Sequence, residues 1–203
     1  MTAAEQLPLL TVDEYLPMEL AAETRHEYIG GYVHAMAGAN NLHNRVAGNV
    51  LITLGSQLTG KPCEAFNSDT KVRIRTIGAT RFYYPDAMVV CEPNSDDAVF
   101  QDRPVVIVEV LSETTRRTDE TEKRDAYLTI PSLAAYLLVE TERPAVAVYR
   151  RRSEGAGVDS FEAQLYQGAG AVVPLPEIEA ELALEAVYRR VTFSEKPADP
   201  SAG

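Results

Sequence analysis

The stretch VVIVEVLS, residues 105–112, determines how we interpret the rest of the chain. It is apolar at both odd and even positions, which is typical of a strand buried on both faces of a sheet. One carboxylate, Glu109, interrupts this apolar run. A charge buried in such a strand is costly unless another group compensates it. The sequence therefore predicts a central strand and a group that faces Glu109.

A second carboxylate, Asp86, opens the preceding predicted strand, residues 86–92. Pro85 fixes that start, because proline is tolerated at the beginning of a central strand and not within it. Consecutive strands are often neighbours, so we expect the carboxylates of Asp86 and Glu109 to converge. Paired carboxylates suit a hard divalent cation such as Mg²⁺ or Mn²⁺. Taken alone, Asp86 could instead cap a turn.

The predicted helix that follows, residues 119–128, carries a lysine on its apolar stripe. Lys123 and Tyr127 share this stripe by i, i+4 spacing, so Lys123 is turned toward the sheet and Tyr127 toward the core. Lys123 is then either part of a site with Glu109 or its partner in a structural ion pair without metal. Asp119, four residues before the lysine, is another candidate partner.

The remaining patterns predict helices and strands in mixed order. Thr11 and Glu14 form a capping box at the start of a helix, and Gly30 and Gly31 connect a hairpin over residues 25–37. Further helices are predicted at residues 40–58 and 185–191, and further strands at residues 71–76, 104–112, 133–140, 145–152 and 161–167. This order predicts an α/β (α+β) fold with a mixed β-sheet flanked by helices.

Composition gives broader limits. With 203 residues, the chain fits one domain, which we place at residues 1–191, followed by a disordered tail at residues 192–203. No apolar run is long enough for a membrane span and the N-terminus does not resemble a signal peptide, so we expect a cytoplasmic protein that does not contact membranes. Cys63 and Cys91 are interpreted as buried free thiols of a reducing compartment.

Three segments in a fixed order carry a family resemblance: YPDAMVV (84–90), VVIVEVLSETTRRTDETEKRDAYL (105–128) and SLAAYLLVE (132–140). Together with the segment 26–54, they resemble the Uma family of restriction endonucleases, within the PD-(D/E)xK nuclease superfamily. The similarity covers roughly residues 11–191, which implies a restriction-endonuclease-like sheet and a single PD-(D/E)xK nuclease-like domain.

This resemblance implies that Asp86 and Glu109 are ligands of Mg²⁺ or Mn²⁺, with Glu27 as a further acidic candidate. Leu111 stands where the parent motif has its lysine, and relocation of that lysine to the next helix implies Lys123. The implied reaction is metal-dependent hydrolysis of phosphodiester bonds. Lys123 would orient the attacking water or stabilise phosphoryl charge in the transition state.

The partner implied by the resemblance is nucleic acid, with DNA expected. The net charge of −11 has the wrong sign for a general nucleic-acid binder, so local basic segments would have to hold the backbone. The residues predicted for this role are Lys71, Arg73, Arg116 and Arg117. A homodimer is expected if both strands are cut.

Several alternatives stay open at this level. Glu27 could be a solvent-facing strand residue, and we interpret His43 as a residue of the first helical turn bonded to backbone rather than as a ligand. A catalytically inactive protein on the same fold could also serve as a module that binds nucleic acid or protein. Leu111 and the acidic net charge favour this second class, whereas Asp86, Glu109 and Lys123 together favour the enzyme.

Overall fold

The structure is a computed structural model, and it describes residues 9–36, 38–152 and 160–193. The helices are α1 (Val12–Ala21), α2 (Asn41–Leu58), α3 (Arg116–Thr118), α4 (Arg124–Tyr127) and α5 (Leu184–Val187), with a π-helix η1 (Asp119–Lys123) and a 3-10 helix η3 (Pro176–Ile178). The strands are β1 (His26–Ile29), β2 (Tyr32–Ala35), β3 (Glu64–Asn67), β4 (Lys71–Thr76), β5 (Ala79–Tyr83), β6 (Ala87–Val90), β7 (Phe100–Gln101), β8 (Pro104–Val110), β9 (Ala135–Val139), β10 (Ala145–Arg151), β11 (Phe161–Gln167), β12 (Val172–Leu175) and β13 (Ala180–Ala183).

The central sheet has six strands in the order β11-β10-β9-β8-β6-β3. Only β8 and β9 run parallel in it; the other neighbours are antiparallel, so the sheet is mixed. A second sheet has the order β2-β1-β5-β4-β7, and β12 with β13 forms a separate hairpin. The predicted α+β class with a mixed sheet and flanking helices is confirmed, and β8 lies inside the sheet with buried residues on both faces.

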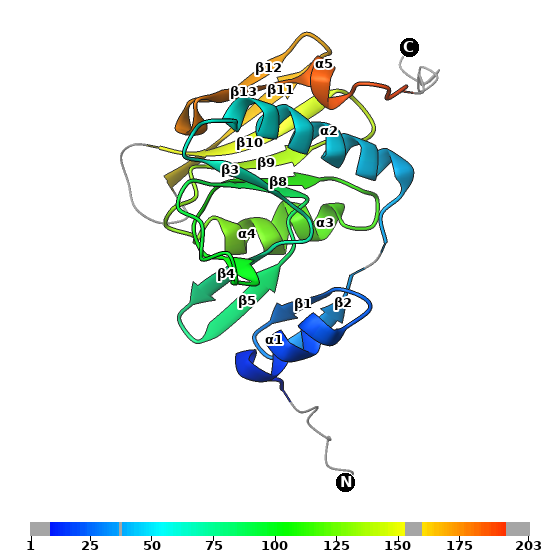
Figure 1. Cartoon of the computed structure of the whole chain (residues 1–203). Coiled ribbons are helices and arrows are strands. Elements are labelled where there is room, and N and C mark those ends of the chain that lie inside the picture. Colours follow the sequence, from blue (N-terminus) through cyan, green and yellow to red (C-terminus); the bar gives the residue numbers. More distant parts are fainter. Residues whose placement is uncertain (1–8, 37, 153–159, 194–203) are drawn as a thin grey trace.

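Each face of the central sheet has its own apolar core. On one face, Val106 and Val108 of β8 pack with Val46 and Val50 of α2, beside α5 and the β12–β13 hairpin. On the other face, residues of β8 pack with α4 and with the strands β4 and β5. Figure 1 shows α2 and α5 above the sheet and α3 and α4 below it, with α1 and the β1–β2 hairpin farther down.

Local sequence signals placed several elements correctly. Thr11 caps α1 in a complete capping box with Glu14, and Asn40 caps α2. Gly30 and Gly31 have φ values of 57° and 104° in the β1–β2 turn, which explains why glycines are needed there. The helix predicted at residues 119–128 is instead three short pieces, α3, η1 and α4, that begin at Arg116.

The expectation of two free thiols is wrong. Cys63 and Cys91 form a disulfide, although they are 28 residues apart in the chain. The reason is the pairing of β3 with β6, which sets Glu64 opposite Val90 and so brings the adjacent cysteines together. Because β3 is short and was not predicted, this register was not visible in the sequence. The predicted tail falls largely on residues 194–203, which lie outside the described residues.

Within the described ranges, no helix is long and apolar enough to cross a membrane.

Candidate active site

The pairing of β6 with β8 brings the two predicted carboxylates together. Ala87 of β6 lies opposite Val108 of β8, so Asp86 and Glu109 occupy the same end of the two strands. The backbone N–H of Asp86 donates to Glu109 Oε2 (3.3 Å), and Asp86 Oδ2 accepts the N–H of Val110 (2.7 Å). Each carboxylate is therefore held by the backbone of the other strand.

Glu109 points to the face of the sheet that α4 covers. Side chains alternate along a strand, and Ile107 and Leu111, its neighbours on this face, belong to the core shared with α4. Glu109 is only 3% exposed. Its Oε1 accepts the hydroxyl of Tyr127 (2.8 Å) and lies 3.5 Å from Nζ of Lys123. The group that faces the buried glutamate is thus the lysine on the apolar stripe of the following helix.

Lys123 contacts three carboxylates from three different elements. Its Nζ lies 2.9 Å from Glu27 Oε1 on β1, and 3.5 Å from both Glu109 Oε1 and Asp119 Oδ1. Asp119 and Lys123 are the first and last residues of the π-helix η1, and both are buried. Single π-helical turns occur often at functional sites. The contact with Lys123 also places Glu27 in this cluster rather than in solvent.

Carboxylates outnumber the amine in this cluster, because Glu27, Glu109 and Asp119 all contact Lys123 and a fourth carboxylate, Asp86, lies beside Glu109. Burial raises the pKa of Glu109 well above its usual value, and the charges of Asp119 and Asp86 raise it further against the opposing effect of Lys123. Burial also raises the pKa of Asp119. For Lys123, burial is outweighed by the surrounding carboxylates, so its pKa is raised and the amine stays charged.

His43 belongs to the same site, which the sequence interpretation missed. Its backbone N–H does bond the N-cap Asn40 (2.9 Å), but its ring is buried and Nε2 lies 3.2 Å from Asp86 Oδ2. Burial lowers the pKa of His43, yet the hydrogen bond and charge of Asp86 outweigh burial and leave it raised. The available signal was position, since His43 lies three residues before Val46 on the apolar stripe of α2.

These side chains line a cleft of about 610 Å³, which we call the acidic cleft and define by Asp86, Glu109, Asp119, Lys123 and His43. Within the described residues, no three His, Cys, Asp or Glu side chains are grouped so as to hold a metal ion. Two carboxylates are nevertheless enough for Mg²⁺, which usually keeps several waters. Asp86 and Glu109 are oxygen donors on one cleft with surplus negative charge, and they fit such an ion.

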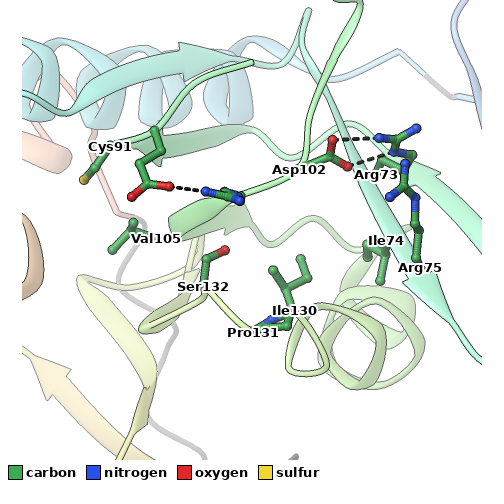
Figure 2. A pocket seen from close by; sticks show the side chains of 11 residues that line it. Arg73, Ile74, Arg75, Cys91, Asp102, Val105, Ile130, Pro131 and Ser132 are labelled. Atoms are coloured by element: carbon green, nitrogen blue, oxygen red, sulfur yellow. Dashed lines mark hydrogen bonds and ion pairs between the residues drawn. The ribbon is translucent and has the colours of Figure 1, made fainter.

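A larger hollow, of about 820 Å³, lies at the opposite end of β8, and we call it the distal pocket. Figure 2 shows Arg73 and Arg75 on one side of it, with Ile130, Pro131 and Ser132 across from them. Arg73 donates to both carboxylate oxygens of Asp102 (2.8 and 2.7 Å), as Figure 2 also shows. The carboxylate of Asp102 in this larger pocket is thus paired with an arginine, and the pocket lies away from the buried carboxylates of the acidic cleft.

The residues predicted to hold nucleic acid lie apart from one another. Lys71 is buried and donates to the hydroxyl of Tyr84 (3.1 Å). Arg116 forms a bidentate pair with Glu140 (2.9 and 2.6 Å). Arg117 is exposed. Arg73 is bound to Asp102. Of the four predicted side chains, only that of Arg117 is both exposed and without an ion pair in the described ranges. Their role in nucleic-acid binding stays a prediction.

The mixed sheet carries two carboxylates at neighbouring strand ends and a lysine from the next helix, the arrangement expected from the resemblance to nucleases. The family Uma2, described as "Putative restriction endonuclease", matches residues 12–186. That match spans most of the chain, and the chain belongs to this family.

The chain is also similar to two uncharacterized proteins and to one solved structure. An uncharacterized protein of Synechocystis sp., slr1290, is 29% identical over 187 residues, which cover 92% of this chain and 95% of that protein. A second one, sll1609, is 36% identical over 137 residues, covering 65% and 75%. A crystal structure from Anabaena variabilis, described as "a putative nuclease belonging to DUF820", has the same fold, with a TM-score of 0.68, 18% identity and coverage of 88% and 97%.

Proposed function

We propose that this protein is a metal-dependent endonuclease that hydrolyses phosphodiester bonds of nucleic acid, with DNA as the substrate. The observation that carries the proposal is the acidic cleft, where Asp86 and Glu109 meet at one end of β6 and β8 and Lys123 faces Glu109. A cluster of four carboxylates, two of them buried, with one lysine is costly as it stands. A divalent cation bound by these carboxylates would compensate their negative charge and so offset that cost.

Asp86 and Glu109 would hold Mg²⁺ or Mn²⁺. When bound, such an ion polarises the phosphate and lowers the pKa of a coordinated water. The surrounding chain keeps the carboxylates in place: Val110 donates its backbone N–H to Asp86, and Tyr127 donates its hydroxyl to Glu109. Fixed ligands of this kind lose little entropy when substrate and metal assemble.

Lys123 would act on the substrate side of the cleft. Its amine is charged and held by Glu27 (2.9 Å), and its longer contacts, 3.5 Å to Glu109 and to Asp119, are the ones it would exchange for a water or a phosphoryl oxygen. Leu111, at the position where the parent motif has its lysine, is buried in the core beneath α4. The amine therefore reaches Glu109 from the helix rather than from the strand.

The proposal extends to four finer points: the nucleic acid, the metal, the oligomeric state and the location. DNA and Mg²⁺ follow from the family description and the donor set, and a homodimer would allow both strands to be cut. A cytoplasmic location stays a proposal, and the Cys63–Cys91 disulfide weighs against it, because disulfides are rare in a reducing cytosol.

The decisive experiment is cleavage of supercoiled plasmid and of single-stranded oligonucleotides with Mg²⁺ or Mn²⁺. We expect Asp86→Ala and Glu109→Ala each to reduce cutting by about 10²-fold or more, because each removes an anchor of the metal. Asp102→Ala, an acidic residue of the distal pocket, is the matched control and should retain most activity. Calorimetry with Mg²⁺ should show binding by the wild type and the control.

Two results would contradict the proposal. Cutting that survives both cleft substitutions would mean a different site or a contaminant. A folded wild type that binds no divalent metal and cuts nothing would favour the inactive binding module on the same fold.

A further inference from the structure

A second basic feature lies outside the acidic cleft, in a hollow of about 460 Å³ between α2 and the turn after α5. We call it the arginine hollow and define it by Arg45, Asn49, Ile52, Arg189 and Arg190. None of these residues is acidic, although the chain as a whole carries a net charge of −11. The hollow is therefore a local concentration of positive charge on an acidic protein.

The three arginines are exposed and none of them is in an ion pair within the described ranges. This distinguishes them from Arg73 and Arg116, whose guanidinium groups are occupied by Asp102 and Glu140. Guanidinium groups match the geometry of phosphate and can bind it through two parallel hydrogen bonds. Their availability makes the hollow better suited to a polyanion than the segments predicted from sequence.

The backbone of the hollow is fixed in advance by contacts from α2. The buried side chain of Asn49 donates to the carbonyls of Val187 (2.9 Å) and Arg189 (3.0 Å), which fastens the end of α5 to α2. Arg45 Nη1 donates to the carbonyl of Arg190 (3.4 Å). Arg190 has a φ of 63°, a conformation that is unfavourable for a residue with a side chain. The surrounding contacts thus hold a strained turn that presents two adjacent arginines.

The arginine hollow and the acidic cleft lie at the same end of α2. Asn44 lines the cleft and the next residue, Arg45, lines the hollow, while His43 reaches Asp86 from the inner side of the helix. A helix with its side chains is roughly 10–12 Å thick. Phosphates of one strand advance about 3.4 Å along the axis of a duplex, so a duplex that passes from the cleft across α2 would reach the hollow roughly three or four nucleotides away.

From these observations we propose that Arg45, Arg189 and Arg190 bind the phosphate backbone of the nucleic-acid substrate beside the cut site. This inference rests on the proposed function. It assigns substrate binding to residues that no sequence signal singled out, and it explains how an acidic protein with an acidic cleft can hold a polyanion.

The test separates binding from cutting. Affinity for a fluorescein-labelled duplex and for the corresponding single strand is measured by anisotropy in EDTA over about 50 to 200 mM KCl. The variant is Arg45→Gln/Arg189→Gln/Arg190→Gln. The control, Arg75→Gln/Arg103→Gln/Arg143→Gln, removes the same charge from exposed arginines elsewhere. Arg189→Gln alone serves as a milder variant, because its side chain supports no hydrogen bond in the described part of the chain.

We expect the hollow variant to bind the duplex about 10-fold or more weakly at the lowest salt, and its log–log salt slope to fall by about 2 to 3, close to one per lost phosphate contact. The control should change the slope by less than about one. Parallel cleavage with Mg²⁺ should show a raised KM with kcat retained in the hollow variant.

Equal binding by the hollow variant and the control would overturn the inference, as would a wild type that binds neither nucleic acid. A wild type that binds but never cuts would contradict the proposed nuclease activity, while the salt slopes would still decide whether the hollow holds phosphate. Weaker binding that is confined to the hollow variant supports the inference in either case.

Discussion

At one end of β6 and β8, Asp86 and Glu109 share the acidic cleft with Lys123, a single buried amine among several carboxylates. At the other end, in the distal pocket, each acidic side chain has its own cation, as Asp102 has Arg73. The two ends belong to the same pair of strands and are built from the same kinds of charged residue. They differ in whether each carboxylate has its own cation: several carboxylates share Lys123 in the cleft, whereas at the distal end both carboxylates have an arginine and Arg75 is left over.

This difference favours the acidic cleft as the end that carries the proposed chemistry. The distal pocket is the larger of the two, but its ion pairs are complete and partly exposed, so nothing in it demands a ligand. The cleft is smaller and holds surplus negative charge away from water, where burial raises the pKa of Glu109. Strongly perturbed carboxylates in a cleft are typical of active sites. Shared, uncompensated carboxylates, rather than volume, therefore favour the cleft as the candidate site.

The largest effect on stability is expected when Lys123, the shared cation of the cleft, is removed. Lys123→Met should lower the free energy of unfolding by about 3–5 kcal/mol, because it leaves three carboxylates without their shared cation. Arg103→Met at the distal end, which removes one member of an exposed pair with Glu92, should cost about 1 kcal/mol or less. Urea unfolding of both variants without divalent metal measures the contrast, and equal costs would show that the two ends do not differ as described.

A somewhat smaller effect is expected from the disulfide at the distal end. Cys63 and Cys91 close a loop with a sequence separation of 28, and Cys91 lines the distal pocket. The replacement Cys63→Ala/Cys91→Ala should lower the free energy of unfolding by roughly 2–4 kcal/mol, mainly because the unfolded chain gains freedom. Calorimetry should show unchanged Mg²⁺ binding in this variant. Loss of metal binding would mean that the two ends are coupled through β6 and β8.

The sequence alone placed Glu109 and Lys123 in the cleft because each interrupts an apolar pattern. Glu109 interrupts a buried strand and Lys123 interrupts an apolar helix stripe, and both lie where those patterns indicated. His43 interrupts the stripe of α2 in the same way, and its contact with Asp86 was overlooked because the first turn of a helix offers backbone partners. The roles of these residues in catalysis stay predictions.

The parts that were missed depend on pairing between distant segments. The strand β3 is short, and β12 contains Pro174, so neither has a clear strand pattern. Missing β3 concealed the register that joins Cys63 to Cys91. Ion pairing is also a matter of tertiary structure: nothing in the local sequence shows that Arg73 faces Asp102 while Arg189 faces no carboxylate.

A third prediction applies one chemical change, acid to amide, at both ends. Glu109→Gln should stabilise the metal-free protein by about 1–2 kcal/mol, because it removes a buried charge that burial and nearby carboxylates already disfavour. Asp102→Asn should destabilise the protein by about 1 kcal/mol, because it breaks the bidentate pair with Arg73. Thermal or urea unfolding in EDTA measures both. Changes of the same sign would contradict the distinction between the two ends.

The smallest expected effect is the pH dependence of the Arg73–Asp102 pair. Burial alone would raise the pKa of Asp102, but the hydrogen bonds from Arg73 and Asn94 and the nearby arginine charges together outweigh burial and lower it. A carboxylate with a lowered pKa in the folded state adds stability above its unfolded pKa, near 3.9, and that stability is lost as the pH falls through the folded pKa.

The difference in unfolding free energy between wild type and Asp102→Asn should therefore be constant near neutral pH and shrink below about pH 4. The amide does not titrate, and the other carboxylates titrate in both proteins, so their contributions largely cancel in the difference. Urea unfolding at several pH values between neutral and the acid limit of folding measures this. A difference that stays constant throughout would mean that the charge of Asp102 contributes nothing, and that the distal end is held by packing and the disulfide instead of by its paired charges.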